Sequence, residues 1–262
     1  GLGEEAPNQP FGARLGHPLE AGVLPRMTPA HSRWDTGKRA MGIHPAVFRA
    51  LSTFYRVLDA RTAQLESTHT EVRCPPTCSQ CCLGSIFFVT ALDFAYVCRY
   101  AQAHIDEATR QAIVAVAEAQ VAQCGAELAR ELDGSETRLE APSGLTCPLL
   151  AHGRCRVYPA RPTPCRLFGR TRYQSGKLNI CDIIFSRLPE GGNGNADPDH
   201  PPSLRFPIVE DMSRSLAAML RRELGPEGIG EAERLLHVST LPIFIATTRF
   251  EELRVYDVTP EA

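Results

Sequence analysis

Apolar residues recur at helical spacing in the first half of the chain. From Pro45 to about residue 66 they lie three or four positions apart, which predicts an amphipathic helix. A second stripe begins after Asp106, and Gly134 is placed to end it. The first stripe contains Val47, Phe48, Leu51, Phe54, Tyr55 and Leu58. The second contains Ile113, Ala117, Val121, Cys124, Leu128 and Leu132.

Three further segments follow helical rules. Thr90, with Asp93 three positions later, forms a capping box that predicts a helix to about residue 104. A stripe after residue 207 predicts a helix that ends at Leu224, before Gly225 and Pro226. A shorter helix is expected over about residues 229–239, and the apolar run LPIFIATT follows it. The stripe after residue 207 contains Ile208, Met212, Leu216, Met219 and Leu220.

Other stretches break the helical pattern. Residues 74–82 read CPPTCSQCC, and residues 141–181 are a run of turns whose five prolines preclude a long helix. Within that run, RCRVY and KLNIC are predicted strands. Residues 188–207 are predicted to be a flexible Gly/Pro-rich loop. Residues 1–40, with five prolines and six glycines, are predicted to be an irregular arm.

These patterns predict a mainly α protein. Residues 41–262 are expected to form one helical domain, in which a cysteine-rich loop and a layer of short β-hairpins bind metal. The cysteine motifs of that domain occupy residues 74–82 and 147–181. At 262 residues and 43% hydrophobic content the chain can bury a core, so it does not need cysteines to hold it together. Its ten cysteines therefore require a chemical explanation.

Net charge and hydropathy argue against two classes of partner, nucleic acid and membrane. A net charge of −2 argues against a protein that coats nucleic acid or a membrane surface. No apolar run reaches about 18 residues, so no membrane span is expected. The first residues lack the basic and apolar regions of a signal peptide, so we expect a reducing, cytoplasmic compartment.

The ten cysteines fall into two kinds. Cys98 and Cys124 lie on predicted helices and are expected to pack in the core as small apolar residues. The other eight lie in loops, and spacings of two to four residues let one turn direct two sulfurs at one metal. These candidate ligands are Cys74, Cys78, Cys81, Cys82, Cys147, Cys155, Cys165 and Cys181.

Alternatives to metal binding fit the pattern less well. Structural disulfides suit an even number of thiols, but the adjacent Cys81 and Cys82 cannot readily bond to each other. A thiol-exchange enzyme would need one activated thiol with a resolving partner, not eight. The eight thiols could form two four-cysteine sites or one site with additional cysteines. We expect the adjacent pair to point to different partners.

The cysteine motifs also carry a family resemblance. The CxxxCxxCC run, the segment CPLLAHGRCRVYPARPTPCRLF and the final Cys181 resemble the YkgJ-type cysteine-cluster family, described as zinc- or iron-chelating. The resemblance covers about residues 74–182. It extends distantly to the cysteine cluster of flagellin lysine methylases, which implies an iron–sulfur cluster, expected as 4Fe-4S, and methyl transfer. Proline beside Cys74 and Cys147 also favours iron–sulfur over zinc, and zinc remains the alternative.

The second cysteine motif is strongly basic. Residues 141–181 contain no Asp or Glu, and their positive charge is expected to lower the thiol pKa values and offset the charge of a thiolate centre. A solvated basic face and an anion site are alternatives. Nucleic acid is unlikely as a partner, since no binding motif accompanies the aromatics there. The cations are Arg154, Arg156, Arg161, Arg166, Arg170, Arg172 and Lys177.

Four residues are candidates for contacts around the centre. Tyr158, Arg161 and Arg166 are expected to support the cluster or face a substrate, and His152 is a general base, a ligand or a turn residue. Common nucleotide-binding and hydrolase motifs are absent. One hypothesis is an enzyme that uses an iron–sulfur cluster for group transfer or redox chemistry on a small-molecule or protein substrate, which could be anionic. The other is a non-catalytic zinc-binding structural or interaction module. The pattern leaves the oligomeric state open.

Overall fold

The structure is a computed structural model, and it describes residues 43–76, 78–129, 138–141, 144–188, 206–248 and 250. The side chain of Leu139 is outside this description. The predicted N-terminal arm at residues 1–40 and residues 189–205 of the predicted loop also lie outside the described residues.

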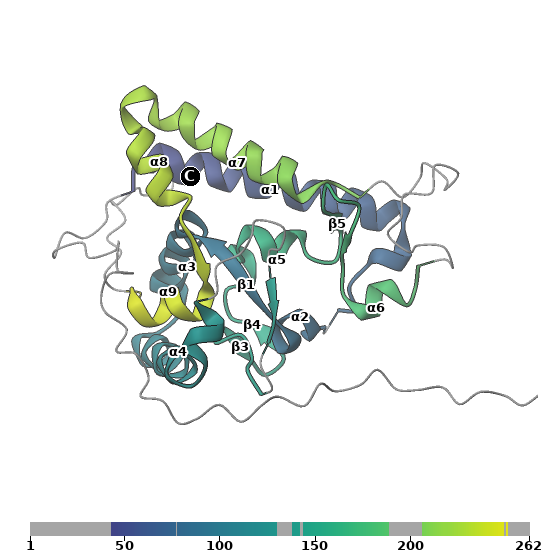
Figure 1. Cartoon of the computed structure of the whole chain (residues 1–262), viewed down its shortest axis with the longest axis horizontal. Coiled ribbons are helices and arrows are strands. Elements are labelled where there is room, and N and C mark those ends of the chain that lie inside the picture. The colour runs from purple at the N-terminus through teal and green to yellow at the C-terminus, as the bar shows by residue number, and fades with distance from the viewer. Residues whose placement is uncertain are drawn as a thin grey trace, which may run out of the picture. The chain divides into compact units, whose positions relative to one another are not determined.

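The described part of the chain is mainly helical, as predicted (Figure 1). Its helices are α1 (Pro45–Thr68), α2 (Gln80–Gly84), α3 (Ala91–His104), α4 (Glu107–Leu128), α5 (Thr163–Leu167), α6 (Asp182–Phe185), α7 (Val209–Leu224), α8 (Ile229–Leu235) and α9 (Leu241–Thr247). Three 3-10 turns join them: η2 (Thr70–Val72), η3 (Tyr158–Ala160) and η4 (Pro226–Gly228). The strands are β1 (Ser85–Thr90), β2 (Arg138–Glu140), β3 (Leu150–Ala151), β4 (Arg154–Cys155), β5 (Thr171–Arg172), β6 (Leu178–Asn179) and β7 (Val238–Thr240).

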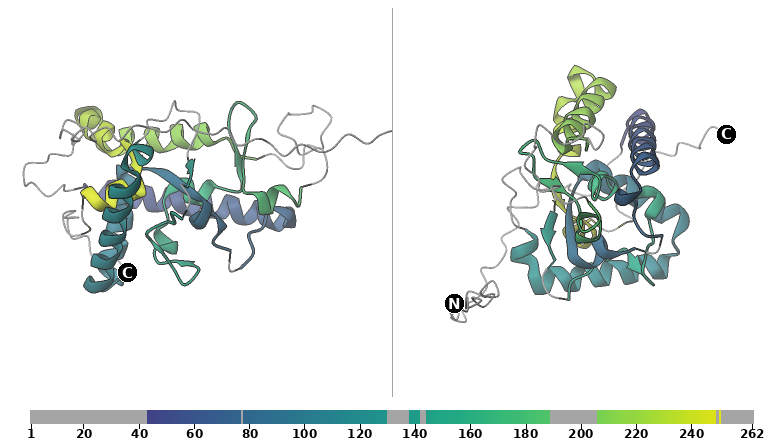
Figure 2. Two further views of the ribbon diagram at one scale, coloured as in Figure 1. Left: turned by 60° about the horizontal axis from the view of Figure 1, so that its bottom comes forward. Right: turned by 90° about the vertical axis from the view of Figure 1, so that its right-hand side faces the viewer.

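The long helices α1 and α7 pack side by side (Figures 1 and 2). The α1 helix begins at Pro45, where the missing proline N–H costs nothing, and His44 accepts a hydrogen bond from the backbone of Ala46. The predicted stripe of α1 faces inward, with Leu51 and Leu58 buried. Both helices have their predicted extents.

Three of the strands form an antiparallel sheet in the order β2-β1-β7. Phe88 of β1 faces Thr240 of β7, and Phe87 faces Arg138 of β2. The pattern did not predict β1, since a short apolar run such as SIFFVT fits a strand or a buried helix equally well. This buried strand begins directly after α2, which carries Cys81 and Cys82.

The capping box at the start of α3 and the core assignment of two cysteines are confirmed. Thr90 accepts a hydrogen bond from the N–H of Asp93, and Cys98 is fully buried within α3. Cys124 is buried against Leu128 and Ile86. Its φ of −134° kinks α4, and the helix ends at Leu128, earlier than the predicted end near residue 134.

The last described elements differ from their predicted form. The helix expected over residues 229–239 ends at Leu235, because Val238 to Thr240 pair with β1 as strand β7. The apolar run LPIFIATT forms helix α9, with Pro242 in its first turn. The α9 helix packs against α4 and β1. Within the described ranges, no helix is long and apolar enough to cross a membrane.

The cysteine-rich layer contains two small hairpins, β3–β4 and β5–β6. The predicted strand RCRVY is a strand only at Arg154 and Cys155, and KLNIC only at Leu178 and Asn179. Pro159 lacks the N–H that would continue a strand, and the chain turns into η3 there. The described residues of the proline-rich segment 141–181 contain no long helix, as predicted, but they include the short helix α5, and α6 begins directly after Cys181.

Candidate metal centre

The first cysteine motif is a tight turn followed by helix α2. The N–H of Cys78 donates to the carbonyl of Pro75 at 3.0 Å, and the N–H of Cys82 donates to the carbonyl of Ser79 at 2.8 Å. Cys74 is exposed at the start of this turn, whereas the next three cysteines are half-buried. One short segment thus carries one exposed thiol and three half-buried thiols.

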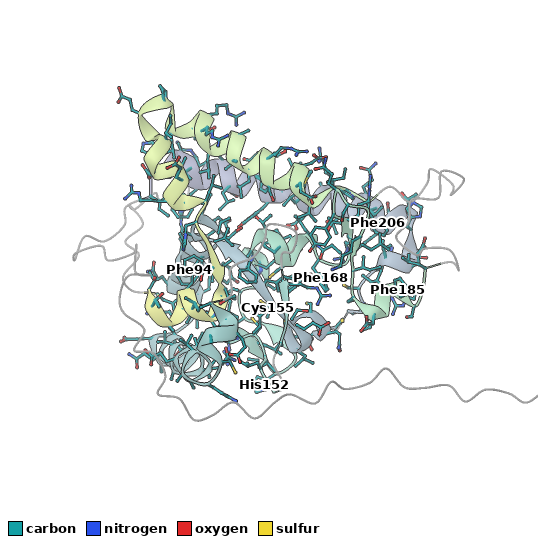
Figure 3. The ribbon with its side chains drawn as sticks, viewed as in Figure 1. Phe94, His152, Cys155, Phe168, Phe185 and Phe206 are labelled. Carbon is teal, nitrogen blue, oxygen red and sulfur yellow. The ribbon has the colours of Figure 1, made fainter. Side chains whose placement is uncertain are left out.

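A main-chain hydrogen bond joins the two cysteine motifs. The N–H of Cys147 donates to the carbonyl of Cys82 at 2.8 Å, although the two residues are far apart in sequence. Cys155 ends the β3–β4 hairpin and pairs with Leu150, and Cys165 lies in α5. Figure 3 labels Cys155 and His152 on this hairpin. The α5 helix packs against both α1 and β1, so it brings its thiol toward the others.

The influence of the eight thiols on one another's pKa values divides them into two groups. The Sγ atoms of Cys81 and Cys82 lie 3.9 Å apart. Cys82 interacts with Cys147 and Cys155, and Cys165 interacts with Cys81, Cys82 and Cys155. We call this set the five-thiol group: Cys81, Cys82, Cys147, Cys155 and Cys165. The three-thiol group is Cys74, Cys78 and Cys181, since Cys74 interacts with the other two.

The expectation that Cys81 and Cys82 serve different metal-binding partners stays a prediction. Their sulfurs lie 3.9 Å apart, and each thiol has an electrostatic interaction with Cys155. Successive side chains alternate between opposite faces of an extended chain, but on a helix they are only about 100° apart. Because both residues lie within α2, their sulfurs can face the same group.

The three-thiol group is held by a separate apolar cluster. Cys181 packs against the cluster that contains Val72, two residues before Cys74, and Phe206. The guanidinium of Arg187 donates to the carbonyl of Arg73 at 3.0 Å. These contacts bring the last cysteine of the second motif beside the first cysteine of the first motif.

Several thiols have a raised pKa, in contrast to what the basic sequence suggested. Burial raises the pKa of Cys165 well above its usual range, and the neighbouring thiols add to this. Burial also raises the pKa of Cys155 and of Cys74, and the guanidinium of Arg161 or Arg170 offsets only part of the effect. The expected lowering of pKa by the arginines is therefore wrong for these thiols.

Hydrogen bonds between thiols also raise the pKa values of the adjacent Cys81 and Cys82. The pKa of Cys81 is raised, first by its hydrogen bond with Cys82 and then by burial. The pKa of Cys82 is raised, first by its hydrogen bond with Cys147. A thiolate at either position would face further thiols instead of a cation, and a bound metal would supply that missing charge.

Arginines of the basic segment face carboxylates on α1, which explains their weak effect on the thiols. Arg161 donates to Asp59 at 3.0 Å, and Arg166, only 2% exposed, pairs with the other oxygen of Asp59. Arg166 also donates to the carbonyls of Pro159 and Arg161 and lies 4.1 Å from the centre of the Tyr55 ring. These two arginines attach the loop layer to α1, so they are neither a solvated basic face nor an open anion site.

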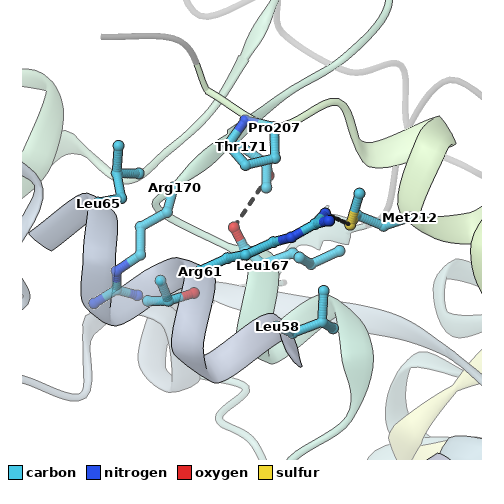
Figure 4. A pocket seen from close by; sticks show the side chains of 9 residues that line it. Leu58, Arg61, Leu65, Leu167, Arg170, Thr171, Pro207 and Met212 are labelled. Atoms are coloured by element: carbon cyan, nitrogen blue, oxygen red, sulfur yellow. Dashed lines mark hydrogen bonds between the residues drawn. The ribbon is translucent and has the colours of Figure 1, made fainter. Parts of the chain in front are cut away.

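Arg170 connects α1 to the three-thiol group. Its guanidinium pairs with Glu66 and hydrogen-bonds to the Cys74 thiol. The buried Nε of Arg170 has no hydrogen-bond partner within the described residues. Its side chain lines a small, largely apolar cavity between α1, α5 and α7, shown in Figure 4, where Arg61 reaches the sulfur of Met212.

The remaining candidates lie at the surface. Tyr158 is 60% exposed, and the Arg161 guanidinium lies 4.2 Å from the centre of its ring. His152 is exposed at the β3–β4 turn, with a φ of 50°, and Gly153 follows with a φ of 72°. Positive φ at both positions is the geometry of a tight hairpin turn, so His152 is a turn residue here.

Sequence reasoning missed three acidic residues beside the centre. Asp59 and Glu66 are seven positions apart on α1, so they lie on the same helical face opposite the basic segment. The spacing of seven residues could have predicted this acidic helix face from the sequence alone. Asp93 was recognised only as a helix cap, but it also accepts hydrogen bonds from Thr163, two residues before Cys165.

Cysteine sulfur is the ligand type of zinc and iron–sulfur sites. The thiols described here do not, however, surround a single point. Five neighbouring thiols are enough for the four sulfur ligands of an iron–sulfur or zinc site. Among the described residues, no three His, Cys, Asp or Glu side chains converge closely enough to hold one metal ion. The thiols would therefore have to move closer together on binding.

Comparisons with known proteins do not identify the chain. No protein-family model, curated protein or solved structure matches it. The resemblance of its cysteine motifs to the YkgJ-type family remains a prediction.

Proposed function

We propose that this chain is a cysteine-ligated metalloprotein whose five-thiol group binds an iron–sulfur cluster. The observation that carries the proposal is the main-chain hydrogen bond between Cys147 and Cys82, which brings thiols of two distant motifs together. In the cluster-bound protein, four of the five thiols act as ligands, and the cluster supplies electron-transfer or group-transfer chemistry. The resemblance to cysteine-cluster proteins supports the same cofactor.

The protein's own residues would shape such a centre. The arginine pairs with Asp59 hold α5 and η3 against α1, and this orients Cys165. The raised thiol pKa values mean that cluster binding must release protons from the five-thiol group. We place this chemistry in the cytoplasm, where thiols remain reduced. Its substrate would be a small molecule or a protein, and Tyr158 is the exposed aromatic side chain nearest Cys155 in sequence.

A structural zinc site is the second candidate. Arg161, Arg166 and Arg170 are paired with carboxylates of α1 and do not present free cations to a substrate. A closed four-cysteine zinc site needs no substrate and would attach the loop layer to the helices. In that case the protein is a non-catalytic module that presents its surface to a partner.

Anaerobic purification followed by metal and acid-labile sulfide analysis separates the two candidates. We expect iron with matching sulfide and a brown visible absorption spectrum, and reconstitution with ferrous iron and sulfide should restore both. A colourless protein with stoichiometric zinc and no sulfide would support the structural site. A chain that binds neither iron nor zinc after reduction would contradict both candidates.

A further inference from the structure

Asp93 is a buried carboxylate with contacts to three parts of the fold. It is fully buried. Its Oδ2 accepts one hydrogen bond from the N–H of Thr90 at 3.3 Å and another from the hydroxyl of Thr90 at 2.8 Å. Its Oδ1 accepts from the N–H of Thr163 at 2.9 Å, from the Thr163 hydroxyl at 2.7 Å and from the Tyr55 hydroxyl. The capping box of α3 uses only Oδ2.

The other oxygen, Oδ1, accepts hydrogen bonds at the start of helix α5, which carries Cys165. Pro162 precedes this helix and provides no side-chain cap, so Asp93 supplies the hydrogen-bond acceptor from 70 positions away in sequence. Tyr55 donates to the same oxygen from α1, and the Arg166 guanidinium lies over the Tyr55 ring. The start of α5 is therefore held by one buried carboxylate.

The hydrogen bonds also select the chemical type of this side chain, because both of its oxygens act as acceptors. Asparagine would keep the shape of the side chain, but its amide N–H₂ would face either the donors of Thr90 or those of Thr163. A carboxylate accepts at both ends, so the site favours aspartate over its neutral isostere.

We infer that Asp93 is a positioning residue for the metal centre: its carboxylate fixes the start of α5, and with it Cys165, relative to the other thiols. The inference rests on the proposed function in one respect only, namely that the five-thiol group holds a metal. The geometric part concerns the placement of Cys165 in the metal-free chain.

Alkylation of the reduced, metal-free chain tests the geometric part. In Asp93→Asn, we expect iodoacetamide to modify Cys165 about tenfold faster than in the wild type, the change expected when loss of a cap increases local opening. Tyr55→Phe is the matched control, since it removes one donor and keeps the charge and both Thr163 contacts. Cys98 should stay protected in both variants, which shows that the core is intact. Unchanged modification of Cys165 in Asp93→Asn would overturn the inference.

Reconstitution with ferrous iron and sulfide tests the consequence for metal binding. We expect Asp93→Asn to bind less iron than the wild type, because a displaced Cys165 no longer meets the geometry that a ligand needs. Tyr55→Phe should keep the wild-type iron content, and equal iron content in all three proteins would show that this placement of Cys165 is not needed for metal binding. If Asp93→Asn does not fold, Thr163→Val removes one contact and should give a smaller increase in Cys165 alkylation. Failure of the wild type to bind iron would refute the proposed cluster, whereas the alkylation result would still decide the placement of Cys165.

Discussion

At the scale of single residues, the most informative feature is the protonation of the thiols. Burial and neighbouring thiols raise the pKa of Cys165, while the nearby arginines are paired with a carboxylate. A basic sequence segment therefore does not imply a basic environment for its cysteines. The effect of a charge depends on where its counterion lies.

This protonation predicts a pH dependence of the metal-free protein. Below about pH 8.5 a thiol with a raised pKa, such as Cys165, is protonated in both the folded and the unfolded chain, so it does not make stability depend on pH. Above that pH the unfolded thiols ionise, while folded thiols with a raised pKa, such as Cys165, do not. The free energy of unfolding should therefore fall as the pH rises, by at most about 1.4 kcal/mol per pH unit for each such thiol.

Urea denaturation under reductant between pH 7 and pH 10 would measure this slope. Cys165→Ala should have a shallower slope than the wild type because it lacks one of these thiols. A free energy of unfolding that rises over the same range would contradict the assignment.

The sorting of the cysteines gives a second prediction at this scale. Cys165→Ser should lose metal and lower the Tm of the metal-loaded protein, because metal-binding free energy stabilises the fold. Cys98→Ala is the matched control, since Cys98 is fully buried within α3. It should lower the Tm through lost packing and keep its metal. Wild-type metal content in Cys165→Ser would remove Cys165 from the set of ligands.

At the scale of elements, α1 organises the cysteine-rich layer. Asp59 holds Arg161 and Arg166, and Glu66 holds Arg170, which in turn contacts Cys74. One face of a helix thus anchors parts of both thiol groups. Changes on that face should affect the loops as well as the helix.

Asp59→Asn tests this anchor. It leaves the buried Arg166 without its ionic partner, and we expect a loss of roughly 1–2 kcal/mol in the free energy of unfolding. The loss should be below that for a fully buried pair because Asp59 is 44% exposed. Asp211→Asn is the control, because its pair with Arg214 is exposed on α7, and it should change stability by less than about 0.5 kcal/mol. Equal effects of the two substitutions in urea denaturation would show that the anchor contributes little.

At the scale of the whole molecule, metal binding should order one part of the chain selectively. The cysteine-rich layer consists of short hairpins and short helices, whereas α4 and α9 pack directly against each other. In hydrogen exchange, metal loading should slow exchange in residues 74–82 and 147–181 more than in α4. Uniform protection across the chain would instead indicate global stabilisation with no local closure of the thiols.

Much of the fold could be predicted from local sequence patterns. The helices α1, α3 and α7 follow from apolar spacing and from end signals such as Pro45, the Thr90 capping box and Gly225. The assignment of Cys98 and Cys124 to the core follows from the same periodicity. Such features depend on neighbours within a few positions, so one sequence is enough to reveal them. The prediction that the other eight cysteines all lie in loops is wrong for Cys81 and Cys82 in α2, for Cys155 in β4 and for Cys165 in α5, because these elements are too short to show a periodic pattern.

Tertiary structure alone decided how the site is assembled. The main-chain hydrogen bond between Cys147 and Cys82, the pairing of Arg166 with Asp59 and the second role of Asp93 all join segments far apart in the chain. No local pattern specifies such pairs, because they depend on how helices and loops pack against one another. The sequence therefore determined which residues are available for chemistry, and packing decided which thiols share a group and which charges reach them.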